Sequence, residues 1–144
     1  MLKHIPAILS PTLLATLMEM GHGDEIVLAD GNYFVGGHAS RVIRADGLAI
    51  PPLLDAILRF FPLDRYVDRP VALMQVTPGD TVETPIWDEY HRIVEHHAPG
   101  TKIENVERFA FYERARGAHV TVTTGERALY ANIILKKGVV VDDA

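Results

Sequence analysis

The hydrophobic residues of this chain fall into short apolar runs separated by amphipathic stretches. The run from Glu25 to Ala29 is unbroken, which is typical of a strand covered on both faces. Residues 71–76 form a second candidate for a buried strand, and residues 120–123 and 133–136 are expected to be two later strands. This pattern favours an α/β arrangement, in which helices cover the faces of a sheet.

Helix starts are marked by polar residues that precede a proline. Ser10 is the expected N-cap of a helix whose first position is Pro11, and Thr84 with Pro85 repeats the pattern. Gly21 is expected to end the first helix. Four helices are predicted, from residue 11 to about 20, from about 51 to 61, from 85 to about 97, and onward from a cap at Asn105.

Composition limits the classes of function. The 144 residues fit a single domain, expected to span residues 1–144, with a core that needs no disulfide. The absence of cysteine excludes thiolate metal sites and cysteine nucleophiles and fits a reducing compartment. The net charge of −5, without a basic stripe, argues against nucleic acid as a partner. No segment of about 18 apolar residues and no signal-peptide pattern is found, so we expect a cytoplasmic protein with no membrane partner.

Two polar side chains lie at the ends of the first buried strand. His22 stands between Gly21 and Gly23, which would leave its ring open to a ligand, and imidazole both gives and takes protons near neutral pH. Asp30 follows the strand, where ligands of open α/β sheets bind. The alternatives are a surface histidine favoured by the helix dipole and an Asx turn that Asp30 makes with Gly31.

A second polar group opens the last strand. Tyr130 and Asn132 are two residues apart, so an extended segment would present their hydroxyl and amide groups on one side. Their alternative role is in the turn that enters the strand. Arg108 offers five donors that could orient a ligand, or it could pair with Glu104 or Glu107. The polar groups near the two termini suggest one shared pocket.

The seven histidines raise the question of a metal site. His91, Glu95, His96 and His97 lie close in sequence, but the His-Glu-x-x-His spacing of zinc enzymes is absent and no third ligand is evident. We therefore expect no metal.

Four blocks of sequence span nearly the whole chain. In order they are Glu19 to Ile26 with Asp30, Val42 to Leu48, Arg108 to Ala115, and Thr124 to Gly138. Together they resemble the RbsD/FucU sugar mutarotase family. The third block reads Arg-Phe-Ala-Phe-Tyr-Glu-Arg-Ala, and the ribose branch of that family has a histidine where this chain has Arg108. The resemblance is therefore to the L-fucose mutarotase branch.

This resemblance implies a fold, a reaction and a set of site residues. The fold would be an RbsD-like three-layer α/β/α domain with a mostly parallel central sheet. The reaction would be the interconversion of the α and β anomers of a free monosaccharide, an isomerase activity without cofactor or metal, on a ring-shaped homo-oligomer that is a decamer in the family. His22 would be the proton donor, and a second catalytic group, Asp30, would line the sugar with Arg108, Tyr130, Ala131 and Asn132.

The loop after Asp30 departs from the family pattern. Fucose mutarotases often continue with Ala-His-Phe-Pro, whereas residues 31–38 here read Gly-Asn-Tyr-Phe-Val-Gly-Gly-His. Because this loop is expected to cover the sugar, L-fucose is the first expectation and D-ribose the alternative. Two other hypotheses are a non-catalytic monosaccharide-binding protein and a scaffold whose subunit contacts involve Phe60, Phe61 and Trp87.

Overall fold

A single mixed sheet organises the fold in the computed structural model, which describes residues 1–36 and 41–142. Its strands follow the order β2-β5-β1-β6-β3-β4. They are β1 (Glu25–Ala29), β2 (Val42–Ala45), β3 (Val71–Met74), β4 (Ile103–Val106), β5 (Val120–Thr124) and β6 (Ile133–Lys136). Strands β1 to β5 run parallel to one another, and β6 runs antiparallel between β1 and β3, which confirms the mostly parallel sheet.

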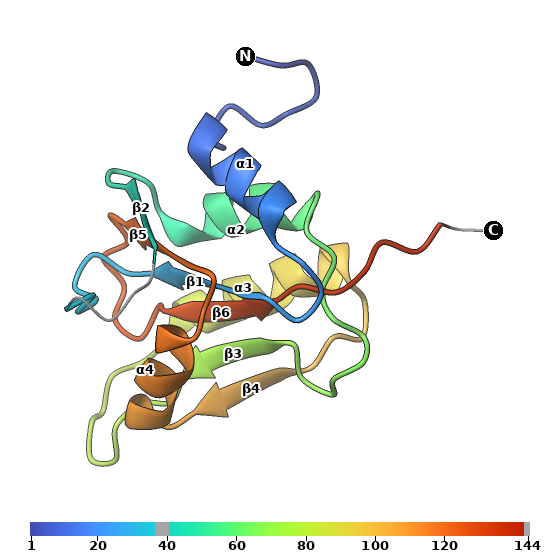
Figure 1. Cartoon of the computed structure of the whole chain (residues 1–144). Coiled ribbons are helices and arrows are strands. Elements are labelled where there is room, and N and C mark those ends of the chain that lie inside the picture. The colour runs from blue at the N-terminus through green and yellow to red at the C-terminus, as the bar shows by residue number, and fades with distance from the viewer. Residues whose placement is uncertain (37–40, 143–144) are drawn as a thin grey trace.

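Helices cover both faces of this sheet (Figure 1). They are α1 (Pro11–Glu19), α2 (Ile50–Leu58), α3 (Pro85–His97) and α4 (Arg108–Arg116). Because successive strand residues point to opposite faces, Ile26 and Leu28 of β1 pack in the core under α1, α2 and α3. Val27 and Ala29 pack on the other face, against Phe111 of α4. The predicted three-layer α/β/α arrangement is confirmed.

N-cap side chains bond to the first turns of α1 and α4. Thr84 precedes Pro85 at the start of α3 as predicted, but its side chain makes no capping hydrogen bond. The Ser10 hydroxyl accepts the N–H of Leu13 at 3.1 Å, as the sequence predicts. The predicted cap at Asn105 is wrong, because Asn105 lies in β4 beside Leu73 of β3. The Glu107 carboxylate caps α4 instead. Strand β4 is at the edge of the sheet and none of its residues is fully buried, so it has no apolar run to reveal it.

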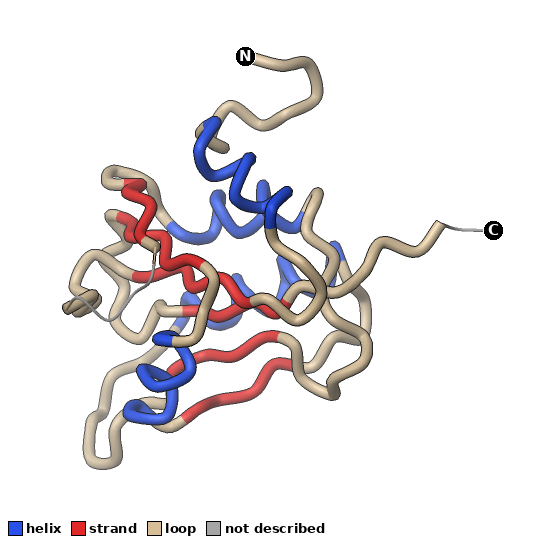
Figure 2. Tube along the Cα trace, viewed as in Figure 1, coloured by secondary structure: helices blue, strands red, loops and turns tan. Residues whose placement is uncertain are grey.

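The loops gather at two edges of the sheet (Figure 2). The carboxyl edge, where β1 to β5 end and β6 begins, comprises residues 30–36, 46–49, 75–84, 107 and 125–132, with the start of α4. The described loops of the opposite edge include residues 20–24, 59–70, 98–102, 117–119 and 137–142. Within the described ranges, no helix has the length and apolar character needed to cross a bilayer. Each edge carries some of the polar residues that the sequence singles out.

Candidate active site

Asp30 and Asn132 lie side by side at the carboxyl edge. The antiparallel pairing of β1 with β6 sets Leu28 opposite Ile133, which brings the residues just beyond them together. The backbone N–H of Asp30 donates to Asn132 Oδ1 at 2.8 Å, and both residues are buried, with 8% and 5% of their surface exposed. The structure therefore joins two residues that lie 102 positions apart in the chain.

The Asp30 carboxyl group has an unusual electrostatic environment. Burial raises its pKa above the ordinary value, and the nearby Glu126 carboxylate adds to this effect. Backbone N–H groups, including that of Asn32 at 2.9 Å from Oδ1, lower the pKa but do not offset the burial. A carboxylate with a raised pKa is a better proton acceptor than an exposed one.

Helix α3 holds the segment that carries Tyr130 and Ala131. The indole Nε1–H of Trp87 donates to the Tyr130 carbonyl at 2.8 Å, and the Tyr90 hydroxyl donates to the Ala131 carbonyl at 2.7 Å. Tyr130 has a positive φ of 55°, a left-handed conformation that needs such support in a non-glycine residue. Its hydroxyl donates to Asp80 Oδ2 at 2.7 Å. No local pattern in the sequence indicates that Trp87 and Tyr90 hold this segment.

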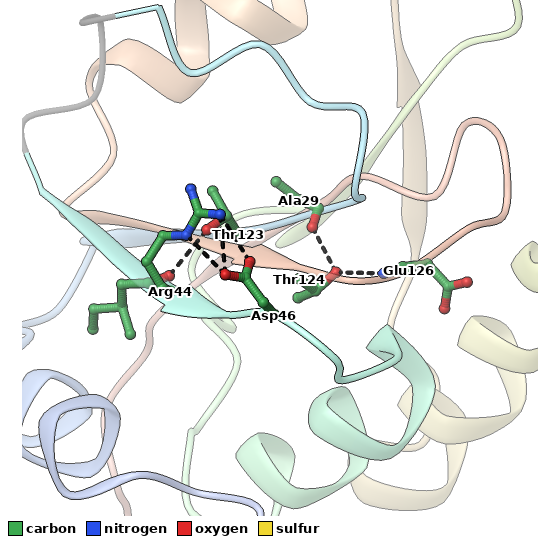
Figure 3. A network of polar contacts seen from close by, with 7 residues as sticks. Ala29, Arg44, Asp46, Thr123, Thr124 and Glu126 are labelled. Carbon is green, nitrogen blue, oxygen red and sulfur yellow. Dashed lines mark hydrogen bonds and ion pairs between the residues drawn. The ribbon is translucent and has the colours of Figure 1, made fainter.

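The Thr124-Gly125-Glu126 motif mainly supports the backbone. The Thr124 hydroxyl donates to the Ala29 carbonyl at 2.7 Å and accepts the Glu126 N–H at 3.1 Å (Figure 3). The Glu126 carboxylate accepts the N–H of Ile50, the first residue of α2, and that of Ala128. These side chains end β1 and β5, cap α2 and fix the loop that leads to Tyr130.

Arg108 is the first residue of α4 and is exposed at the carboxyl edge. Its guanidinium carbon lies 5.8 Å from the centre of the Phe109 ring. The two carboxylates considered as its partners have other hydrogen bonds, since Glu104 accepts from Arg114 at 2.6 Å and Glu107 caps the helix. The position of Arg108 therefore suits contact with a ligand.

An aromatic cavity of about 340 Å³ lies beside Arg108. Its lining includes Tyr33, Phe34, Phe109 and Tyr112. The rings of Tyr33 and Tyr112 are 5.3 Å apart, and burial raises the pKa of Tyr33 to about 12. The loop after Asp30 thus packs against α4, while its residues 37–40 lie outside the described ranges.

His22 lies at the opposite edge, in the turn between α1 and β1. Its Nε2 atom is 3.0 Å from Oδ1 of Asp64, and its ring centre is 5.2 Å from that of Tyr66. The His22 side chain is 43% exposed, whereas that of Asp64 is only 4% exposed. An accessible imidazole is therefore backed by a buried carboxylate.

Asp64 is held by its own neighbours. Its Oδ1 also accepts the Tyr66 N–H at 3.0 Å, and its backbone N–H donates to the Lys136 carbonyl at 3.0 Å. Burial raises the pKa of Asp64, but the Tyr66 N–H and His22 outweigh burial and lower the pKa overall. The carboxylate form is therefore favoured. Asp64 is 42 residues from His22 and was not a candidate from sequence.

The two edges are separated by the length of β1. Five residue steps from Glu25 to Asp30 span about 16 Å, and His22 lies beyond Glu25. One chain gathers Asp30, Tyr130, Ala131 and Asn132 at the carboxyl edge, with Arg108 at the same edge, but it places His22 at the other. The expectation of one shared pocket within a single chain is therefore wrong.

The remaining sequence candidates are the histidines of a possible metal site and the aromatic residues considered for subunit contacts. Among residues 1–36 and 41–142, no three His, Asp or Glu side chains are placed to hold a metal ion. His97 pairs with Asp55 at 2.7 Å. Phe61 is buried in the core and Trp87 packs against it, so of the three aromatic residues considered for subunit contacts only Phe60 is exposed.

Comparison with known proteins identifies the family of this chain. The model of the RbsD / FucU transport protein family matches residues 3–140. The chain belongs to this family. It is 50% identical to the fucose mutarotase of Homo sapiens over 144 residues, 96% of this chain and 94% of that protein. Among RbsD / FucU structures, the fucose mutarotase of Streptococcus pneumoniae in complex with L-fucose is 55% identical, with a TM-score of 0.91 over 97% of this chain and all of that one.

More distant RbsD / FucU structures share the fold. The RbsD of Bacillus subtilis, complexed with D-ribose, is 22% identical, with a TM-score of 0.71 over 98% of this chain and all of that one. At this identity the likeness concerns the fold alone.

Proposed function

We propose that this chain is a mutarotase that interconverts the α and β anomers of free L-fucose. The observation that carries the proposal is the 55% identity, over 97% of the chain, to a fucose mutarotase whose crystal structure contains L-fucose. The buried Asp30–Asn132 pair and the pinned Tyr130 segment support it, because they form a polar cluster at the edge where α/β sheets bind ligands.

The sugar site is formed by two copies of the chain. Since His22 and Asp30 lie at opposite ends of β1, one sugar contacts both only if they come from different copies. Exposed apolar side chains are present at both edges, which supports a contact between them. They are Phe34, Phe109 and Leu129 at the carboxyl edge and Tyr66, Val140 and Val141 at the opposite edge.

A contact of the carboxyl edge of one copy with the opposite edge of the next is heterologous, and such contacts close into rings when the rotation permits. The proposed assembly is therefore a ring-shaped homo-oligomer, for which the family resemblance gives ten copies. A cytoplasmic location is part of the proposal and is supported by the absence of cysteine.

Mutarotation needs an acid and a base and no other reagent. The acid, His22 in its imidazolium form, gives a proton to the ring oxygen as the bond from the anomeric carbon to that oxygen breaks. The base, the Asp30 carboxylate, takes the proton of the anomeric hydroxyl, whose electrons form the carbonyl. Rotation about the adjacent carbon–carbon bond presents the other carbonyl face, and reclosure returns both protons. Such catalysis contributes about 10²–10⁴-fold in rate.

The remaining groups orient the sugar. Arg108 carries five N–H donors in a fixed plane and stays protonated, so it serves as a hydroxyl-binding group and not as a base. Asn132 accepts the Asp30 N–H through Oδ1, which leaves its amide NH2 group as a donor for a sugar hydroxyl. The Tyr130 hydroxyl donates to Asp80, so it would meet the sugar as an acceptor. The loop after Asp30 differs from the usual fucose pattern, and this observation keeps D-ribose as the second candidate substrate.

Anomer exchange measured by proton NMR saturation transfer tests the proposal. We expect substoichiometric protein to accelerate the exchange of L-fucose more than that of D-ribose or D-galactose. Calorimetry with the same sugars distinguishes the alternatives. Binding without faster exchange would identify a non-catalytic sugar-binding protein. Faster exchange of D-ribose alone would identify D-ribose as the substrate in place of L-fucose. The absence of both sugar binding and faster exchange would contradict the proposal.

A further inference from the structure

Asp64 is the one close partner that the structure gives to the His22 ring nitrogens among the described residues. The contact joins Nε2 to Oδ1 at 3.0 Å. A carboxylate only accepts hydrogen bonds, so Nε2 must carry a hydrogen for this contact to form. The other ring nitrogen, Nδ1, then has the proton that can be given up or the lone pair that can take one.

We propose that Asp64 is a positioning residue for catalysis: it holds the Nε2–H of His22, so that Nδ1 exchanges protons with the sugar. The inference rests on the mutarotase function proposed above, and it extends that function to a residue that no sequence pattern connects with His22. Asp64 contacts the imidazole at Nε2, and the sugar contacts it at Nδ1.

Asp64, which supports His22, is itself held by several contacts. Two donors, the Tyr66 N–H and the His22 ring, converge on the same Asp64 oxygen. The Asp64 backbone is tied to Lys136, and Leu63 forms an isolated bridge with Lys137. The Tyr66 ring lies beside the imidazole. These contacts fix the direction of Oδ1, and a fixed acceptor fixes the plane and the nitrogen of the ring that faces it.

The proton balance of the reaction is unchanged by this role. When Nδ1 gives its proton to the ring oxygen, imidazolium becomes neutral imidazole, while Nε2–H remains on the ring. Asp64 stays a carboxylate throughout, which its lowered pKa favours. On reclosure Nδ1 takes the proton back.

A second histidine–aspartate pair provides a matched comparison. His97 Nε2 lies 2.7 Å from Asp55 Oδ1, but the burial is reversed, with the histidine 14% and the aspartate 55% exposed. There a solvent-exposed carboxylate covers a mostly buried ring. Asp55→Asn is therefore a suitable control for Asp64→Asn.

The test measures kcat and KM for L-fucose exchange in Asp64→Asn, Asp64→Ala and Asp55→Asn. Asparagine retains an oxygen for the Tyr66 N–H, so the loop is preserved, but its hydrogen bond to the ring lacks the charge. We expect kcat to fall about 10-fold in Asp64→Asn and further in Asp64→Ala, with KM changed by less than about 2-fold. Asp55→Asn should keep both constants.

A second readout does not depend on activity. In ¹⁵N-labelled wild-type protein, long-range ¹H–¹⁵N spectra should show a hydrogen-bonded proton on Nε2 of His22, and this signal should move upfield in Asp64→Asn. Wild-type kcat in Asp64→Asn, a change in KM alone, or a wild-type ring with its hydrogen only on Nδ1 would overturn the inference. If the wild type exchanges no sugar, the proposed function fails while these spectra still decide the Asp64 contact.

Discussion

The two ends of β1 carry the two halves of the proposed site, and they are built differently. At the carboxyl edge, Asp30 and Asn132 are buried, the Asp30 backbone N–H donates to the Asn132 side-chain oxygen, and α3 holds the neighbouring segment. At the opposite edge, His22 is accessible and depends on one buried carboxylate, that of Asp64.

This difference separates residues that also support the fold from an accessible residue that does not. The buried side chains of the carboxyl edge stabilise the fold and belong to the proposed site, so their substitution should affect stability and activity together. The His22 side chain is 43% exposed and its hydrogen-bond partner is Asp64, so its substitution should affect activity much more than stability.

Replacement of His22 by alanine should have the largest effect on activity. Loss of the proton-transfer group is expected to lower kcat for L-fucose exchange by about 10²–10⁴-fold. The free energy of unfolding should fall by about 1 kcal/mol, because the buried Asp64 carboxylate loses one hydrogen bond and keeps that from the Tyr66 N–H. His97→Ala removes the other aspartate-paired histidine and should retain exchange. Equal losses in the two variants would contradict the assigned role of His22.

Two inactive variants should restore activity when they assemble together. His22→Ala keeps an intact carboxyl edge, and Asp30→Asn keeps an intact His22 turn. If each site takes one residue from each of two copies, random mixing at equal amounts makes about a quarter of the sites complete. Exchange should therefore return to about a quarter of the wild-type value after joint refolding. If a mixed assembly recovers no activity, His22 and Asp30 of each site must come from the same chain.

Asn132→Ala should lower stability as well as activity. The buried N–H of Asp30 loses its acceptor, and an unsatisfied buried group costs about 1–3 kcal/mol. Urea unfolding at neutral pH measures this loss. Asn32→Ala is the matched control, because Asn32 is exposed and bonds to Asp30 through its backbone N–H, which alanine retains. A loss of the same size in the control would show that the Asn132 side chain has no special role.

The parts of the fold that carry a local signal were predictable from sequence. The bounds of β1, β6 and α3 agree with the apolar runs and with the Thr84-Pro85 start. The polar residues 130–132 do meet Asp30, because strand pairing brings the ends of β1 and β6 together. Local patterns thus identified the carboxyl edge almost completely.

The features that depend on distant contacts were not predictable. Asp64 gives only the signal of an Asx turn with Tyr66, and nothing in the sequence connects it with His22. Tyr90 belongs to the apolar face of α3, and its bond to Ala131 depends on how that helix packs. The sequence places His22 and Asp30 at the two ends of one strand, and an extended strand holds its ends apart, so one pocket within a single chain was not to be expected from that placement.

The pH dependence of stability should distinguish the two edges by sign. The pKa of Asp30 is raised from 3.8, chiefly by burial, so its contribution to stability decreases as pH rises from about 3.8 through the folded-state pKa. The pKa of Asp64 is lowered from 3.8 despite its burial, because the Tyr66 N–H and His22 favour the carboxylate, so its contribution is lost as pH falls from about 3.8.

Urea unfolding of wild type, Asp30→Asn and Asp64→Asn between about pH 3 and pH 7 measures both contributions. The stability of wild type relative to Asp30→Asn should decline with rising pH above about 3.8, and its stability relative to Asp64→Asn should increase with rising pH below about 3.8. Neither slope should exceed about 1.4 kcal/mol per pH unit, the limit for one proton. Slopes of the same sign would mean that the two carboxyl groups occupy similar environments, and the contrast between the edges would then rest on exposure alone.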